Sequence, residues 1–141
     1  MAEKIQAYVL DSFALLAYFQ AERGGLAVRA LFESAHDSQV KLHVSLINVG
    51  EMYYITHREQ GHARAEEMLR DLRALPVTLE PATEERILAS ARIKSTYPLS
   101  YADAFAVTLT QEFGATLVTG DPEFQNVASL VKLLWLSPSN L

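Results

Sequence analysis

The sequence contains no cysteine, which excludes disulfide bonds and thiolate metal ligands. A chain of this kind suits a reducing compartment, and we expect it to be cytoplasmic. It also lacks the run of ~20 apolar residues that a membrane-spanning helix needs, so no membrane association is expected. The apolar start is not expected to be a signal peptide, because Gln6 and Asp11 interrupt it and no small-residue cleavage site follows.

A basic excess is missing as well, since 12 Lys and Arg stand against 17 Asp and Glu, a formal net charge of −5. Domains that bind nucleic acid by bulk electrostatics usually have a basic face. A nucleic-acid enzyme with this charge would need cations at its site, or a local basic patch that the total conceals. No repeat or linker-like run interrupts the sequence, and we expect a single domain over residues 1–141.

Short apolar segments alternate with helical patterns along the chain. The predicted strands are residues 7–10, 42–45, 77–79, 116–119 and 131–136. Helices are predicted over residues 62–75, 83–96 and 100–113, and the Gly pair at 24–25 splits the first helical segment in two. Nearly continuous apolar strands that alternate with helices indicate an α/β fold, with a central, mostly parallel sheet of about five strands covered on both faces.

Four acids are predicted to meet at one edge of this sheet. Asp11 follows the first strand and Asp121 follows the fourth, while Glu51 and Asp103 lie near the starts of two helices. Ligands of parallel sheets bind at the carboxyl ends of the strands. Gathered carboxylates repel one another unless a cation neutralises them. An all-oxygen ligand set favours Mg²⁺ or Mn²⁺, ions that are often shared with a phosphate, so the pattern indicates chemistry at a phosphodiester.

Each acid also has a structural interpretation. Asp11 can cap the helix that begins at Ser12, and Asp103 fits the S-x-x-D variant of a capping box. Asp121 can be a turn residue before a proline. Glu51 is harder to explain in this way, because its neighbours are apolar and an unpaired glutamate among them would be costly.

Three polar residues are expected to support the acids. Asn48 lies three positions before Glu51 on one helix face and can hydrogen-bond a ligand water; its alternative is an ordinary helix-start position. Ser12 and Thr119 can position a water or a ligand, or only cap a helix and end a strand. Glu123 fits a solvated helix start better than a role beside the acids. Phe13 belongs to an apolar ridge that is expected to be mostly core.

Four segments carry a resemblance to a known family. VLDSFALLAYF, SLINVGEMYY, LSYADAFAVTL and LVTGDPEF resemble the PIN-domain family, especially its VapC-type toxin ribonucleases, from Tyr8 to about Trp135. The resemblance implies a three-layer α/β/α PIN-like fold and Mg²⁺- or Mn²⁺-dependent cleavage of RNA. It also implies a homodimer and a cognate antitoxin, as in a type II toxin–antitoxin system.

The resemblance also assigns roles to residues of this chain. Ser12 and Thr119 match the small hydroxyl positions beside the first and last acids. The residues that match the acidic catalytic and metal-binding set are Asp11, Glu51, Asp103 and Asp121.

The leading hypothesis is therefore an endoribonuclease that hydrolyses RNA with a metal-activated water, as the toxin of such a pair. One alternative is a PIN-like module that binds RNA or protein without cleavage, and another is an RNA-processing nuclease with no antitoxin. A phosphotransferase of the haloacid-dehalogenase kind would need a second acid two residues after Asp11, where this sequence has Phe13.

Overall fold

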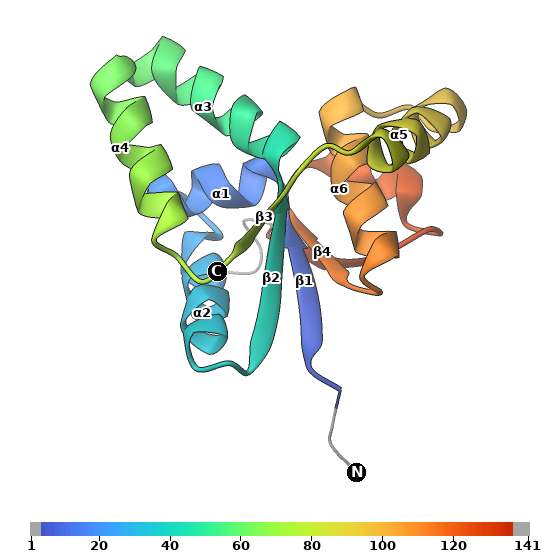
Figure 1. Cartoon of the computed structure of the whole chain (residues 1–141), viewed down its shortest axis with the longest axis horizontal. Helices are drawn as coiled ribbons and strands as arrows, with labels where there is room; N and C mark the ends of the chain where they lie inside the picture. The colour runs from blue at the N-terminus through green and yellow to red at the C-terminus, as the bar shows by residue number, and fades with distance from the viewer. Residues whose placement is uncertain (1–3, 137–141) are drawn as a thin grey trace.

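The computed structural model describes residues 4–136, which form five strands, six α-helices and one 3₁₀ helix (Figure 1). The strands are β1 (Gln6–Leu10), β2 (Val40–Ser45), β3 (Thr78–Glu80), β4 (Thr116–Thr119) and β5 (Lys132–Trp135). The helices are α1 (Ser12–Phe19), α2 (Gly25–His36), α3 (Leu46–Gln60), α4 (His62–Arg73), α5 (Glu84–Thr96), α6 (Tyr101–Glu112) and the 3₁₀ helix η1 (Pro122–Val127).

The strands form one sheet in the order β3-β2-β1-β4-β5, and all four neighbouring pairs are parallel. This confirms the predicted α/β fold. From β1 the chain moves outward through β2 to β3, then crosses to β4 on the other side of β1. The strand order therefore reverses between β1 and β4, and ligands of open α/β sheets bind at such a switch point, beyond the carboxyl ends of the strands.

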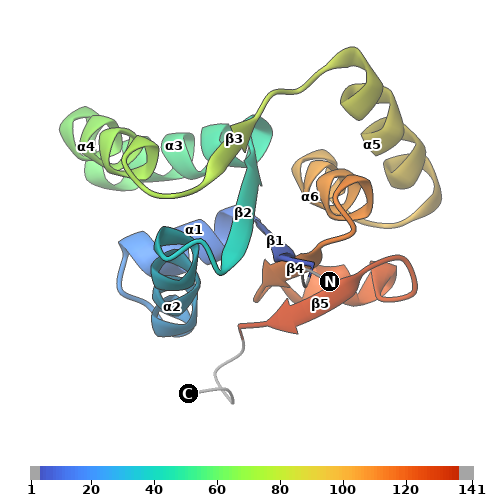
Figure 2. The same cartoon turned by 60° about the horizontal axis from the view of Figure 1, so that its bottom comes forward.

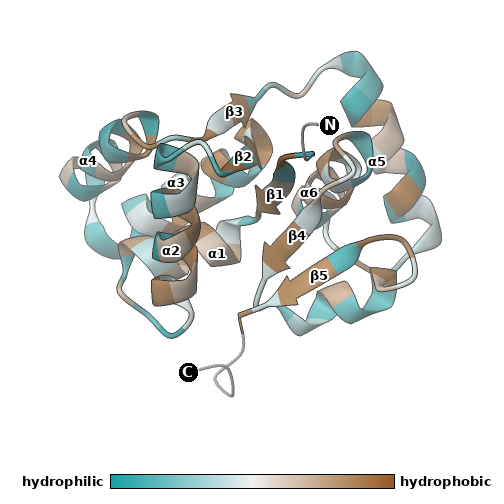
Figure 3. Cartoon of the chain, turned by 90° about the horizontal axis from the view of Figure 1, so that it is seen from below, coloured by the Kyte–Doolittle hydropathy of each residue, from teal (hydrophilic) through white to brown (hydrophobic). Residues whose placement is uncertain are grey.

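Helices cover both faces of the sheet. Helices α1 to α4 lie on one face, and α5, α6 and η1 lie on the other (Figure 2). Successive strand residues point to opposite faces, so Leu10 and Val118 pack against the first layer while Val9 and Leu117 pack against the second. Most of β1 and β4 is hydrophobic, as a sheet covered on both faces requires, whereas much of α4 is hydrophilic (Figure 3).

Short-range capping fixes where the helices at the carboxyl edge of the sheet begin. Ser45 Oγ accepts a hydrogen bond from the Ile47 N–H at 3.1 Å and starts α3. Ser100 Oγ accepts from the Asp103 N–H at 3.1 Å and starts α6. These caps satisfy N–H groups that a helix start otherwise leaves without partners. Within residues 4–136, no helix is both long and apolar enough to cross a bilayer.

Candidate metal centre

Asp11 lies at the switch point, between β1, α1 and β4. Its side chain is only 1% exposed. Oδ1 accepts a hydrogen bond from the Ala14 N–H at 2.8 Å and caps α1. Oδ2 accepts from the hydroxyl of Thr119, the last residue of β4. One oxygen of the carboxylate therefore caps α1, and the other links the end of β1 to the end of β4.

Thr119 connects Asp11 to Asp121. Its fully buried hydroxyl donates to Asp11 Oδ2 and accepts from the Asp121 N–H at 3.0 Å. Asp121 in turn caps η1, because its Oδ1 accepts from the Glu123 N–H at 2.9 Å. The predicted turn role of Asp121 thus coexists with a place at the edge of the sheet.

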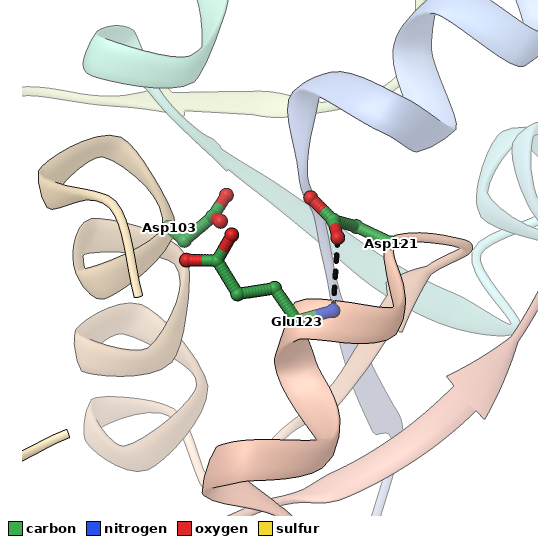
Figure 4. Close-up of side chains that lie close together, drawn as sticks. All are labelled: Asp103, Asp121 and Glu123. Atoms are coloured by element: carbon green, nitrogen blue, oxygen red, sulfur yellow. Dashed lines mark hydrogen bonds between the residues drawn. The ribbon is translucent and has the colours of Figure 1, made fainter. Parts of the chain in front are cut away.

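Three carboxylates converge closely. Ligand oxygens of Asp103, Asp121 and Glu123 all lie within 4.8 Å of one another. Asp103 extends from the first turn of α6, and the other two extend from the loop after β4 and the start of η1, with the three carboxylates facing one another (Figure 4). Glu123 lies in the first turn of η1 and is partly exposed, as expected for a helix start, but its carboxylate also belongs to this cluster.

Glu51 and Asn48 approach from α3. The Ser12 hydroxyl donates a hydrogen bond to Glu51 Oε1. Asn48 is fully buried, and its Nδ2 donates to the Ala102 carbonyl oxygen at 3.1 Å, which joins α3 to α6 next to Asp103. Asn48 Oδ1 is the only buried side-chain N or O atom in residues 4–136 that has no hydrogen-bond partner. Such an atom costs about 1–3 kcal/mol unless a donor such as a bound water satisfies it.

Burial and mutual repulsion perturb two of these acids. Burial raises the pKa of Asp11 to about 7, against hydrogen bonds from Thr119 and Ala14, and the charges of Asp103 and Asp121 add to the rise. Burial likewise raises the pKa of Asp103 to about 7, with contributions from the charges of Asp121, Glu123 and Glu51. The acids thus behave as one electrostatically coupled group.

Within the described part of the chain, the coupled acids have no basic partner. None of the ion pairs found between side chains of residues 4–136 includes Asp11, Glu51, Asp103, Asp121 or Glu123. A divalent cation would neutralise them, and an oxygen-only donor set suits Mg²⁺ or Mn²⁺. The unpartnered Asn48 Oδ1 beside the acids is consistent with an ordered water there. The residues present therefore fit a hydrated hard cation.

All seven predicted site residues lie at this edge of the sheet, but they are not equivalent. The closest carboxylate triad contains Asp103 and Asp121, together with Glu123, which the sequence analysis set aside. Asp11 and Glu51 lie outside that triad, and each accepts a hydrogen bond from a hydroxyl group. Phe13 is 38% exposed, so the prediction that it packs in the core was wrong.

The fold and the acids define a doubly wound parallel α/β domain with an acidic centre at its switch point. Residues 8–130 match the family model described as PIN domain. The chain therefore belongs to the PIN-domain family, as its motifs predicted. No curated protein sequence matches it.

Solved structures with the same fold include VapC20 of Mycobacterium tuberculosis, described as a sarcin-ricin loop cleaving toxin. It is 17% identical, with a TM-score of 0.71 over 85% of this chain and 94% of that one. VapBC2 of Rickettsia felis, bound to a DNA fragment from its promoter, is 14% identical, with a TM-score of 0.68 over 92% and 98%. VapBC-1 of nontypeable Haemophilus influenzae is 17% identical, with a TM-score of 0.65 over 93% and 98%. At these identities the likeness establishes the fold.

Proposed function

We propose that the chain is a Mg²⁺- or Mn²⁺-dependent endoribonuclease. The observation that carries this proposal is the convergence of acids, with no basic partner among residues 4–136, at the switch point of a PIN-family sheet. A cation would also offset the repulsion between the acidic centre and a polyanionic substrate.

Each group at the centre has a separate role in this proposal. Asp103, Asp121 and Glu123 would hold the cation, and Asp11, held by the Thr119 hydroxyl, would add negative charge nearby. When bound, the cation supplies a more acidic water and offsets charge that develops on the leaving oxygen of the phosphodiester. The other residues of the site would contribute to catalysis mainly by orienting the water and the substrate.

Glu51 and Asn48 are suited to that orientation. The Ser12 hydroxyl holds the Glu51 carboxylate, which can accept a hydrogen bond from the attacking water. Asn48 Oδ1 is a free acceptor for a water hydrogen beside Asp103. The first turns of α3 and α6 bring positive helix-dipole ends toward the centre, which favours the approach of a phosphate.

We further propose that the protein acts as a homodimer, as the toxin partner of a cognate antitoxin, in the cytoplasm, with residues 1–141 forming one domain. Support for the antitoxin partner comes from solved proteins of the same fold, which include a toxin–antitoxin complex of Klebsiella pneumoniae and DNA-bound VapBC of Salmonella typhimurium. Induction of the chain alone should arrest growth, and co-expression of the protein encoded by a small adjacent reading frame should relieve the arrest. Absence of arrest, with cleavage in vitro intact, would instead favour an RNA-processing nuclease.

The nuclease proposal is tested by incubating purified protein with total RNA and Mg²⁺ or Mn²⁺, with EDTA as the blank. Cleavage should disappear in the folded variants Asp103→Asn and Glu51→Gln. Glu59→Gln removes an exposed acid of α3 and serves as the matched control, with cleavage unchanged. Cleavage that persists in Asp103→Asn or in EDTA would refute the proposal. Metal and RNA binding without any cleavage would favour a binding module.

A further inference from the structure

An exposed aromatic ring stands beside the acidic centre. Phe13 is 38% exposed, although it occupies the second position of α1, directly after Ser12 and two residues after Asp11. Its ring also lies on the loop that follows β4. A Cβ built on Gly120 would lie 2.2 Å from Phe13 Cε1 and 2.5 Å from Cζ. The ring edge therefore packs directly on the backbone between Thr119 and Asp121.

The backbone that carries this ring is held by a helix cap, and one edge of the ring is supported by the loop after β4. Asp11 caps the helix turn that carries Phe13, through the 2.8 Å bond to the Ala14 N–H. The ring occupies the space beside Gly120, so that even an added Cβ would lie 2.2 Å from Phe13 Cε1, and this limits movement of the ring toward the loop. A rigid apolar group loses little conformational entropy when a ligand covers it. Phe13 is thus an exposed but preorganised platform.

Tyr101, the other exposed aromatic near the edge, is engaged elsewhere. Its hydroxyl donates to the Ile87 carbonyl oxygen of α5 at 3.4 Å, and its ring lies 5.2 Å from that of Phe105 at an angle of 57°. Phe13 is flanked along the chain and in space by residues of the acidic centre, whereas Tyr101 is held against α5 and its own helix. This contrast selects Phe13 as the group that a bound substrate would meet.

We propose that Phe13 is a stacking platform for an unpaired nucleobase next to the phosphate held at the acidic centre. This inference rests on the proposed nuclease function. Every nucleobase has a π-face, and stacking on an aromatic side chain is largely independent of sequence. A base within a duplex is already stacked on both sides and would first have to be extruded.

Binding without turnover tests the proposal directly. Fluorescence anisotropy would follow a short fluorescein-labelled single-stranded oligoribonucleotide, and its duplex, with Ca²⁺ in place of Mg²⁺. Stacking contributes enough that Phe13→Leu should weaken single-strand binding on the order of 10- to 100-fold, while Phe13→Tyr should retain it. Tyr54→Leu removes a 52% exposed aromatic that lies under the Arg58 guanidinium and serves as the control. Binding of Phe13→Leu equal to that of the wild type would overturn the proposal.

Tryptophan fluorescence gives a second test, which does not depend on a loss of affinity for RNA. The sequence has one tryptophan, Trp135, so Phe13→Trp combined with Trp135→Phe gives a single reporter at the platform. Addition of the single-stranded oligoribonucleotide should quench its fluorescence, whereas an equal concentration of duplex should have much less effect. Unchanged fluorescence at saturating single-stranded RNA would contradict stacking, even if Phe13→Leu proved poorly folded.

The outcomes separate this inference from the function on which it rests. If the wild type neither binds nor cleaves RNA, both fail. If the wild type cleaves RNA with metal and Phe13→Leu is unchanged in binding and in KM, the stacking inference alone fails. If Phe13→Leu keeps its RNA affinity but loses a protein partner, the platform serves that partner and the inference is likewise overturned.

Discussion

Replacement of Asp11 by Asn is expected to stabilise the protein in EDTA at pH 8 while weakening its response to divalent cations. The pKa of Asp11 is raised from 3.8 to about 7, chiefly by burial. Between these values the folded protein keeps a proton that the unfolded chain has lost. The free energy of unfolding of the wild type therefore falls as pH rises from about 4 to about 7 and then levels off.

The size of the effect follows from the same shift. A carboxyl whose pKa rises from 3.8 to about 7 lowers the stability at pH 8 by about 4 kcal/mol. The amide of Asp11→Asn has the shape of a protonated carboxyl, with an oxygen for the Ala14 N–H and a nitrogen that can donate to Thr119. We expect Asp11→Asn to raise the free energy of unfolding at pH 8 by about 2–4 kcal/mol, and the gain to vanish near pH 4.

Urea denaturation at several pH values, in EDTA and in Mg²⁺, measures both effects. Mg²⁺ at 100 times its Kd would stabilise the wild type by about 2.7 kcal/mol, and Asp11→Asn should gain less because it has lost one of the coupled charges. Glu59→Gln, an exposed substitution, should match the wild type throughout. The reasoning is refuted if Asp11→Asn is no more stable than the wild type in EDTA at pH 8, or if wild-type stability is flat between pH 4 and 7.

Three further substitutions probe the same edge of the sheet. Glu123→Gln should weaken Mn²⁺ binding by about 10- to 100-fold in calorimetry, and unaltered affinity would remove Glu123 from the ligand set. Thr119→Val removes the donor to Asp11 and should lower the free energy of unfolding in Mg²⁺ by about 1–3 kcal/mol, measured by urea denaturation; a neutral effect would show that this bond is dispensable. Gly120→Ala places a methyl group against the Phe13 ring and the Leu136 carbonyl oxygen and should cost about 1–3 kcal/mol by the same measurement, whereas an unchanged stability would mean that both groups can shift to make room.

Much of the fold could be predicted because its signals are local. Strand β4 spans the predicted residues 116–119, and the predicted start of α6 lies within one residue of the observed one. Ser45 and Ser100 cap their helices through bonds to residues two or three positions along, which a sequence reader can recognise. The region of the site was also predictable, because parallel strands bring their carboxyl ends to one edge.

The details that were missed depend on contacts between distant segments. Glu123 joins the triad because the short 3₁₀ turn after Asp121 directs its side chain toward α6, and the sequence DPE gives only a weak sign of that turn. Phe13 sits in an apolar run that is typical of a core. Its exposure depends on how α1 meets Gly120, a contact that no local pattern specifies.

A divalent cation at the switch point is the central claim, and a crystal soaked in Mn²⁺ tests it most directly. A single strong anomalous peak is expected within bonding distance of carboxylate oxygens of Asp103, Asp121 and Glu123, and it should be absent in crystals of Asp103→Asn. No peak at millimolar Mn²⁺, or a peak on another face of the molecule, would contradict it.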